Sequence, residues 1–205
     1  MQSAPKKRAL KLRWALGLAG ALFVSSSVAG CGYNDVIDRD QAVRAGWAEV
    51  ENQYQRRADL VPNLVRTVQG AANFEKTTLQ NVVEARAKVG SVHVDSSTID
   101  DPAKLKQFEE AQGQLSGALS RLLVVAEQYP DLKATAAFRD LQAQLEGTEN
   151  RITVARRRYI ESVAEYNATV LRFPSSIGAG MRGMKPRPNF AATTPGAEKA
   201  PEVKF

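Results

Sequence analysis

The fold of this chain is decided by residues 138–173, which read FRDLQAQLEGTENRITVARRRYIESVAEYNATVLRF. Apolar side chains recur in this stretch at alternating intervals of three and four residues, which is the period of one face of an α-helix. The stripe runs from Phe138 to Phe173 without a proline. It therefore predicts one long helix over residues 132–173.

Three further helices are predicted upstream. A stripe from Leu105 to Tyr129 predicts a helix over 102–129, with Asp101 as its N-cap and Pro102 at its first position. The Tyr129-Pro130 step ends it, because the residue before a proline is pushed out of the helical region. Weaker stripes predict helices over 35–69 and 74–89.

The first two helices contain less regular signals. The chain is expected to reverse at 70–73, where Gly70 would end one helix and Asn73 would cap the next. Pro62 lies inside the first stripe, so it predicts either a kink or a new helix capped by Asp59.

Four helices joined by short connections predict an all-α protein, an antiparallel up-and-down four-helix bundle with long first and last helices. Thr148 falls on the apolar stripe beside Glu149, Asn150 and Arg156, which predicts a partly buried polar layer. A buried polar group must be paired, so we expect Glu149 to pair with Arg57 of the first helix.

The stripe from Tyr159 to Phe173 extends past the two shorter middle helices. We expect it to be exposed and to mediate association between bundles, with a helical kink or a tail folded back over it as the alternatives. Residues 179–205 are rich in proline and lack an apolar period, so they are predicted to form a flexible basic tail.

The first 31 residues have the order of a bacterial lipoprotein signal. Basic residues precede an apolar run over 14–24, and small residues lead to Cys31, the only cysteine. This order predicts a signal peptide over 1–30, cleavage before Cys31, and a bundle over 31–178 anchored through acyl chains on Cys31. The alternative is an uncleaved membrane helix. Gly32 stands where an Asp would retain a lipoprotein in the inner membrane, so a diderm host would carry the protein on the periplasmic face of its outer membrane.

Charge and residue counts restrict the chemistry. Five of the 28 basic residues and none of the 22 acidic residues lie in 1–30, so the mature chain is nearly neutral and a nucleic-acid partner is not expected. One histidine and one lipidated cysteine leave no two-His metal site, His-based triad or disulfide. Adjacent carboxylates such as Glu109 and Glu110 have the pattern of a solvated helix face. We expect no enzyme activity, metal or cofactor.

Several short motifs resemble the signature of the LemA family over about residues 33–190. They are Arg56-Arg57-Ala58-Asp59-Leu60-Val61-Pro62-Asn63-Leu64-Val65, Glu75, Ala85-Arg86, Tyr129-Pro130-Asp131-Leu132, Thr148-Glu149-Asn150, Ala155-Arg156, Tyr159, Tyr166-Asn167 and Phe173-Pro174. The resemblance implies a membrane-attached helical bundle of bromodomain-like topology that faces outside the cytoplasm and has no established enzymatic activity.

The resemblance also supplies the structural and interaction candidates. They are Arg57, Asp59, Pro62, Asn63, Glu149, Asn150, Arg156, Tyr159, Tyr166 and Asn167. The chain departs from the family pattern in its N-terminus, which carries a lipoprotein signal in place of the usual membrane helix. It also has Ala71 and Phe74 where the family often has Tyr and His, and Ile160 where Asn is frequent.

These observations predict a lipid-anchored, extracytoplasmic scaffold or adaptor of the cell envelope. It would act through association with other envelope proteins or with further copies of itself. The alternatives are a regulator or sensor of an envelope protease or phosphatase, and a lipid- or cell-wall-binding module.

Overall fold

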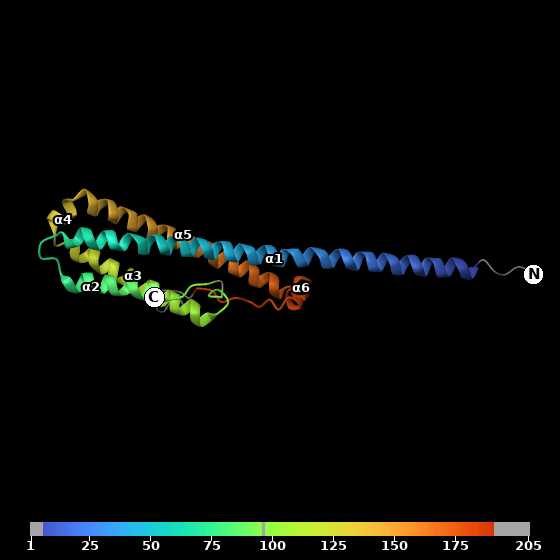
Figure 1. Ribbon diagram of the computed structural model, residues 1–205. Helices are drawn as coiled ribbons and strands as arrows, with labels where there is room; N and C mark the ends of the chain where they lie inside the picture. The colour runs from blue at the N-terminus through green and yellow to red at the C-terminus, as the bar shows by residue number, and fades with distance from the viewer. Residues whose placement is uncertain (1–5, 96, 191–205) are drawn as a thin grey trace, which may run out of the picture. The chain divides into compact units, whose positions relative to one another are not determined.

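A computed structural model describes residues 6–95 and 97–190, with side chains described for 34–95 and 97–190. The described residues contain six helices and no strand, so this part of the chain is all-α, as predicted. The helices are α1 (Lys6–Gln69), α2 (Lys76–Ser91), α3 (Pro102–Ala126), α4 (Pro130–Ala134), α5 (Ala136–Leu171) and α6 (Ser175–Met181) (Figure 1).

The start of α3 has the predicted cap. The Asp101 side chain accepts hydrogen bonds from the backbone N–H groups of Ala103 and Lys104, and Pro102 occupies the first helical position. The helix ends at Ala126, just before the Tyr129-Pro130 step. The long final helix is also confirmed, although α4 is separated from α5 at Thr135.

Pro62 does not start a new helix. α1 continues through it to Gln69, and Asp59 lies inside the helix, where it accepts a hydrogen bond from Gln55 at 2.8 Å. Of the two alternatives predicted for Pro62, the new helix capped by Asp59 is therefore wrong. Val61 and Leu64 on either side of the proline are fully buried, and helical stability in proteins comes mainly from such packing.

The chain reverses over 70–73, as predicted, but by a different geometry. The left-handed residue of the turn is Asn73, with φ of 62°, and not Gly70. Glu75, and not Asn73, is the N-cap residue of α2. Asparagine tolerates the left-handed region better than most residues, which suits it to this turn.

The chain divides into two compact units. One comprises Met1–Ala42 and Ala164–Pro186, and the other comprises Val43–Val163 and Arg187–Phe205. The second unit contains an apolar core to which α1, α2, α3, α4 and α5 all contribute. Its most deeply buried members are Val61, Leu64, Val68, Val82, Leu115, Leu122, Ala126 and Phe138.

The apolar stripe of α5 is buried, which contradicts the expectation that Tyr159 to Phe173 would be exposed. Tyr159, Val163, Tyr166 and Val170 are all buried, and only the end of the stretch, including Phe173, is exposed. These buried residues are therefore not available as the contact surface for the predicted association between bundles.

The chain after α6 covers part of this stripe, so residues 179–190 are not the flexible tail that composition predicted. In the second unit, the Phe190 ring lies 5.1 Å from the Tyr159 ring, and Asn189 donates a hydrogen bond to the Ile160 carbonyl at 3.3 Å. In the first unit, the Tyr166 hydroxyl donates to the Lys185 carbonyl at 3.2 Å. The prediction for 191–205 lies outside the described residues.

Cys31 falls within α1, but its side chain lies outside the described residues, so lipidation and cleavage stay predictions. Among the described residues, no helix has a stretch long and apolar enough to cross a bilayer.

Candidate functional site

Arg57 is a buried cation at the centre of the second unit. Only 2% of its surface is exposed, although its guanidinium is charged. One terminal nitrogen donates to Glu149 at 3.0 Å and to the Ser116 hydroxyl at 2.9 Å. The other donates to the side chain and the carbonyl of Gln112, at 2.7 and 3.0 Å. The predicted pairing of Glu149 with Arg57 is thus present.

Arg156 extends this network along α5. Its guanidinium donates to the Tyr54 hydroxyl at 3.0 Å and to Glu109 at 3.1 Å, and it lies 4.0 Å from the centre of the Phe190 ring. The Arg57 guanidinium lies 5.0 Å from the centre of the Tyr54 ring. We call this set the arginine layer; its members are Tyr54, Arg57, Glu109, Gln112, Ser116, Glu149 and Arg156. It ties α1, α3 and α5 together.

Three of the seven residues of the arginine layer, Arg57, Glu149 and Arg156, were predicted as candidates from the sequence. Tyr54 and Gln112 lie on the predicted apolar stripes, so a polar residue on such a stripe was the available signal for them. Glu109 was interpreted as part of a solvated face, which is wrong, because its side chain is 16% exposed and pairs with Arg156. Glu110 next to it is exposed, 3.8 Å from Lys106.

A third arginine, Arg86, compensates for Pro62. Proline has no backbone N–H, so the carbonyl of Ala58, four residues earlier, lacks its helical donor. Arg86 of α2 donates its Nε–H to that carbonyl at 3.1 Å. The proline and the arginine, 24 positions apart in the sequence, therefore act as one feature that joins α1 to α2.

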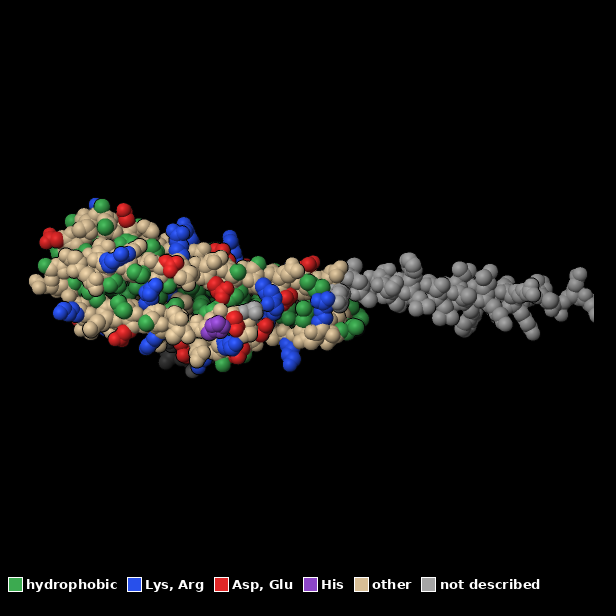
Figure 2. Space-filling view, viewed as in Figure 1, with side chains coloured by type: hydrophobic (Ala, Val, Ile, Leu, Met, Phe, Trp, Pro, Cys, Tyr) green, Lys and Arg blue, Asp and Glu red, His purple; other side chains and the backbone are tan. Residues whose placement is uncertain are grey.

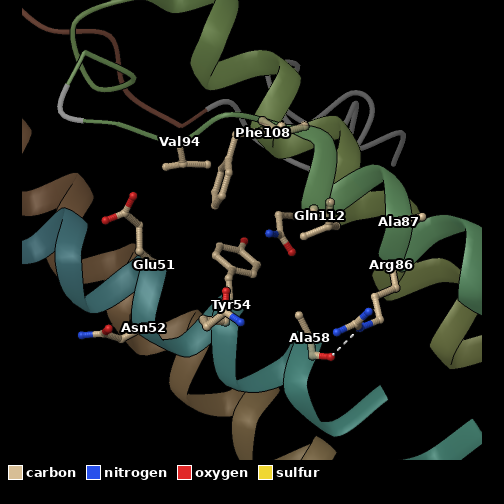
Figure 3. A pocket seen from close by; sticks show the side chains of 13 residues that line it. Glu51, Asn52, Tyr54, Ala58, Arg86, Ala87, Val94, Phe108 and Gln112 are labelled. Carbon is tan, nitrogen blue, oxygen red and sulfur yellow. Dashed lines mark hydrogen bonds between the residues drawn. The ribbon is translucent and has the colours of Figure 1, made fainter. Parts of the chain in front are cut away.

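An open groove lies beside both features. It has a volume of about 460 Å³ and is formed by α1, the end of α2, the following loop and α3. Figure 3 shows Tyr54, Phe108 and Gln112 between Glu51 on one side and Arg86 on the other. The rings of Tyr54 and Phe108 meet edge to face at 5.1 Å, which fixes them as a rigid floor.

The two rims of the groove carry opposite charges. Burial raises the pKa of the Glu51 carboxyl, and the nearby Trp47 indole N–H opposes part of that rise. The Arg86 side chain is exposed, and its Nε–H donates a hydrogen bond to the Ala58 carbonyl of α1. A mainly apolar floor with a few polar groups at its edges is the usual composition of a binding site.

The other predicted candidates are spread over the molecule. Asp59, Asn63 and Asn150 are exposed on the surfaces of α1 and α5, and the Asn63 amide accepts a hydrogen bond from Arg66 at 2.6 Å. Tyr166 and Asn167 belong to the first unit, in which Tyr166 is buried and Asn167 is half-buried. The ten candidates therefore do not form one site.

Tyr159 is a buried phenol without a hydrogen-bond partner. Its surface is fully covered by neighbours that include Trp47 and Phe190, and its hydroxyl has no partner among the described residues. Burial raises its pKa to about 12. Such a group holds its proton at neutral pH, so it acts here as part of the aromatic core.

The described side chains do not assemble a recognisable reaction centre. His93 is exposed in the loop before α3, and no group of three or more His, Cys, Asp or Glu among the described residues is placed to hold a metal. The buried charged groups face internal partners. The groove beside Tyr54 is a hollow of the described surface that another molecule can enter, and the 720 Å³ hollow between the end of α1 and α4 is a second one.

Comparison with known proteins relates most of the chain to one family. The LemA family model matches residues 46–205. Magnetosome protein MamQ 2 of Paramagnetospirillum magneticum is 25% identical over 169 residues, which cover 75% of this chain and 62% of that protein. Protein LemA of Metamycoplasma hominis is 25% identical over 141 residues, covering 68% of this chain and 60% of its own length. The chain thus spans about three-fifths of these relatives.

Proposed function

The chain belongs to the LemA family, and on that premise we propose that it is a non-enzymatic adaptor of the cell envelope. It is held on a membrane by acyl chains on Cys31, outside the cytoplasm. Its helices form an antiparallel up-and-down bundle that binds segments of partner proteins in the groove beside Tyr54.

The groove is the observation that carries this proposal. Tyr54 and Phe108 offer an apolar floor for one side chain, and Glu51 and Arg86 offer groups of opposite charge within the same hollow. The arginine layer behind the floor immobilises Tyr54 through Arg57 and Arg156, so little side-chain freedom is lost when a ligand binds. An extended partner segment can use all of these contacts at once.

The same charges argue against catalysis. Arg57, Arg156, Glu109 and Glu149 bond to one another and to neighbouring polar groups. A catalytic base needs an open position toward a substrate, and internal pairing removes that position.

Site-specific photocrosslinking of the full chain in native membranes tests the proposal. A photoreactive residue in place of Asn52, on the groove rim, should give a discrete adduct with a partner. Ala87→Trp should fill the groove and abolish that adduct without changing the melting temperature. A probe in place of Gln80, an exposed α2 residue outside the groove, is the matched control.

An adduct that persists with Ala87→Trp, or that forms equally from residue 80, would show that the groove is not the binding site. An adduct with twice the mass of the chain would identify a second copy as the partner.

A further inference from the structure

Four large apolar side chains are exposed within eleven residues of the first unit. They are Leu171 (69% exposed), Phe173 (80%), Ile177 (58%) and Met181 (82%), at the end of α5 and along α6. The other exposed large apolar residues in the described part are Val83, Val124, Val154 and Ile160, which lie at least six positions apart in the sequence. Single exposed apolar residues need no explanation, whereas a cluster marks a contact surface. Hydrophobic side chains gather over α6 in Figure 2.

α6 presents its larger apolar residues outward. Ala179 is its buried residue, at 1% exposure, while Ile177 and Met181, four residues apart, share an outward face. A surface helix normally buries its large apolar residues and exposes its polar ones. This reversed arrangement requires a partner that accepts apolar groups from outside the protein.

The charged residues of the segment that carries this cluster have one sign. From 166 to 186 the sequence contains Arg172, Arg182 and Lys185, all on exposed positions, and no acidic residue. The first unit also contains Asp35 of α1 and Glu165 of α5, and both pair with Arg39. An apolar cluster whose own segment carries only basic residues matches the surface of a bilayer with anionic lipids, because its headgroups attract cations and its acyl region accepts apolar side chains.

The cluster also lies at the level where the chain is expected to enter the membrane. Arg39 of α1 forms an ion pair with Glu165 of α5 within the first unit. α1 and α5 run in opposite directions, and Leu171 is six residues or about 9 Å beyond Glu165. The end of α5 is therefore level with the first described side chains of α1, at residue 34, three positions after Cys31.

We propose that the corner formed by the end of α5 and α6 rests on an anionic membrane surface. Phe173, Ile177 and Met181 enter the boundary between headgroups and acyl chains, and the three basic residues contact lipid phosphates. The corner is thus a second attachment point beside the acyl chains of Cys31, and it fixes the orientation of the first unit on the bilayer. This inference rests on the membrane attachment in the proposed function.

Depth-dependent quenching of the full lipidated chain in vesicles tests the inference. Cys31 is the only native cysteine, and lipidation blocks it, so Ile177→Cys provides one thiol for an environment-sensitive fluorophore. In vesicles of phosphatidylcholine with phosphatidylglycerol, nitroxide-labelled lipids should quench this probe severalfold more than the same probe at Val83→Cys, an exposed position on α2. Vesicles without phosphatidylglycerol, and the triple variant Arg172→Gln, Arg182→Gln, Lys185→Gln, should each reduce the quenching.

Flotation of the labelled protein with the vesicles separates the possible failures. If the chain floats but residue 177 is no better quenched than residue 83, the corner does not touch the membrane, while the proposed attachment stands. If the chain does not float, both are wrong. A probe at 177 that becomes shielded only at a high ratio of protein to lipid, without quenching, would assign the corner to contact between copies and overturn the inference.

Discussion

Removal of the Arg86 guanidinium should destabilise the protein only while residue 62 is a proline. Arg86 Nε–H donates to the Ala58 carbonyl at 3.1 Å, and that carbonyl lacks a helical donor because Pro62 has no N–H. In a Pro62→Ala background the new backbone N–H of residue 62 can bond to Ala58. Arg86→Ala then removes a hydrogen bond that the helix has already replaced.

The expected size follows from the surroundings of the bond. An unsatisfied buried carbonyl costs about 1–3 kcal/mol, and the low end applies because Ala58 and Arg86 border an open groove that water can enter. We expect Arg86→Ala to lower the free energy of unfolding by about 1 kcal/mol, or about 2–4 °C in melting temperature for a chain of this size. In the Pro62→Ala background the loss should fall to a few tenths of a kcal/mol.

A double-mutant cycle on the full chain measures this coupling. Thermal and urea unfolding would be followed by circular dichroism for the native chain, both single variants and the double variant. Arg86→Gln, which keeps an N–H donor, should recover part of the loss. Lys88→Ala removes a neighbouring α2 cation that bonds to Gln114 of α3, so its effect should be the same in both backgrounds. Equal effects of Arg86→Ala in the native chain and in the Pro62→Ala background would refute the explanation.

Four other predictions concern the anchor and the interior. Glu149→Ala should lower the free energy of unfolding by about 1–2 kcal/mol, which is less than for a fully buried ion pair because Glu149 is half exposed. The control Glu146→Ala, on the same helix, should change the urea midpoint little. Cys31→Ser should cause the unprocessed precursor to accumulate and should abolish incorporation of labelled fatty acid; normal maturation would indicate a signal anchor. Phe190→Ala should cost about 3 kcal/mol and change the tryptophan emission, because the ring contacts Tyr159 and the Trp47 side chain; an unchanged spectrum and melting temperature would place 190 outside the core. Ultraviolet titration should show that the Tyr159 phenol ionises at about pH 12. The free energy of unfolding should fall as the pH rises from 10 to 12, because the phenol of the unfolded chain loses its proton at a lower pH than that of the folded chain; Tyr159→Phe should remove both effects.

Helix positions were largely predictable because their signals are local. The three-and-four spacing of apolar residues, the Asp101-Pro102 start and the Tyr129-Pro130 stop each depend on a few neighbouring residues, and α3 and α5 end within three residues of their predicted limits. The errors occurred where distant segments override a local rule. Pro62 remains inside α1 because its neighbours are buried, and because an arginine of another helix supplies the missing hydrogen bond.

The candidate site was only partly predictable for the same reason. A polar residue on an apolar stripe signals a buried polar group, which led to Thr148, to Glu149 and to the pairing of Glu149 with Arg57. The pattern does not say which partner from another helix will face it, so Ser116 was missed and Glu109 was interpreted as solvated. Phe190 had no periodic signal at all, since it lies in an extended proline-containing segment.

The sequence by itself determined that this chain is helical and that its signature residues match the LemA family. It also determined, to within three residues, where α2 and α3 begin and where α1, α2, α3 and α5 end, whereas the start of α1 at Lys6 and the short helix α6 were not predicted. Those properties depend on the spacing of side chains along a single backbone. Only the tertiary structure decided that residues 187–190 cover α5, that two arginines meet around Tyr54, and that a charged groove opens beside them. These features arise where residues far apart in the chain come into contact, and the burial they create decides which polar groups need partners.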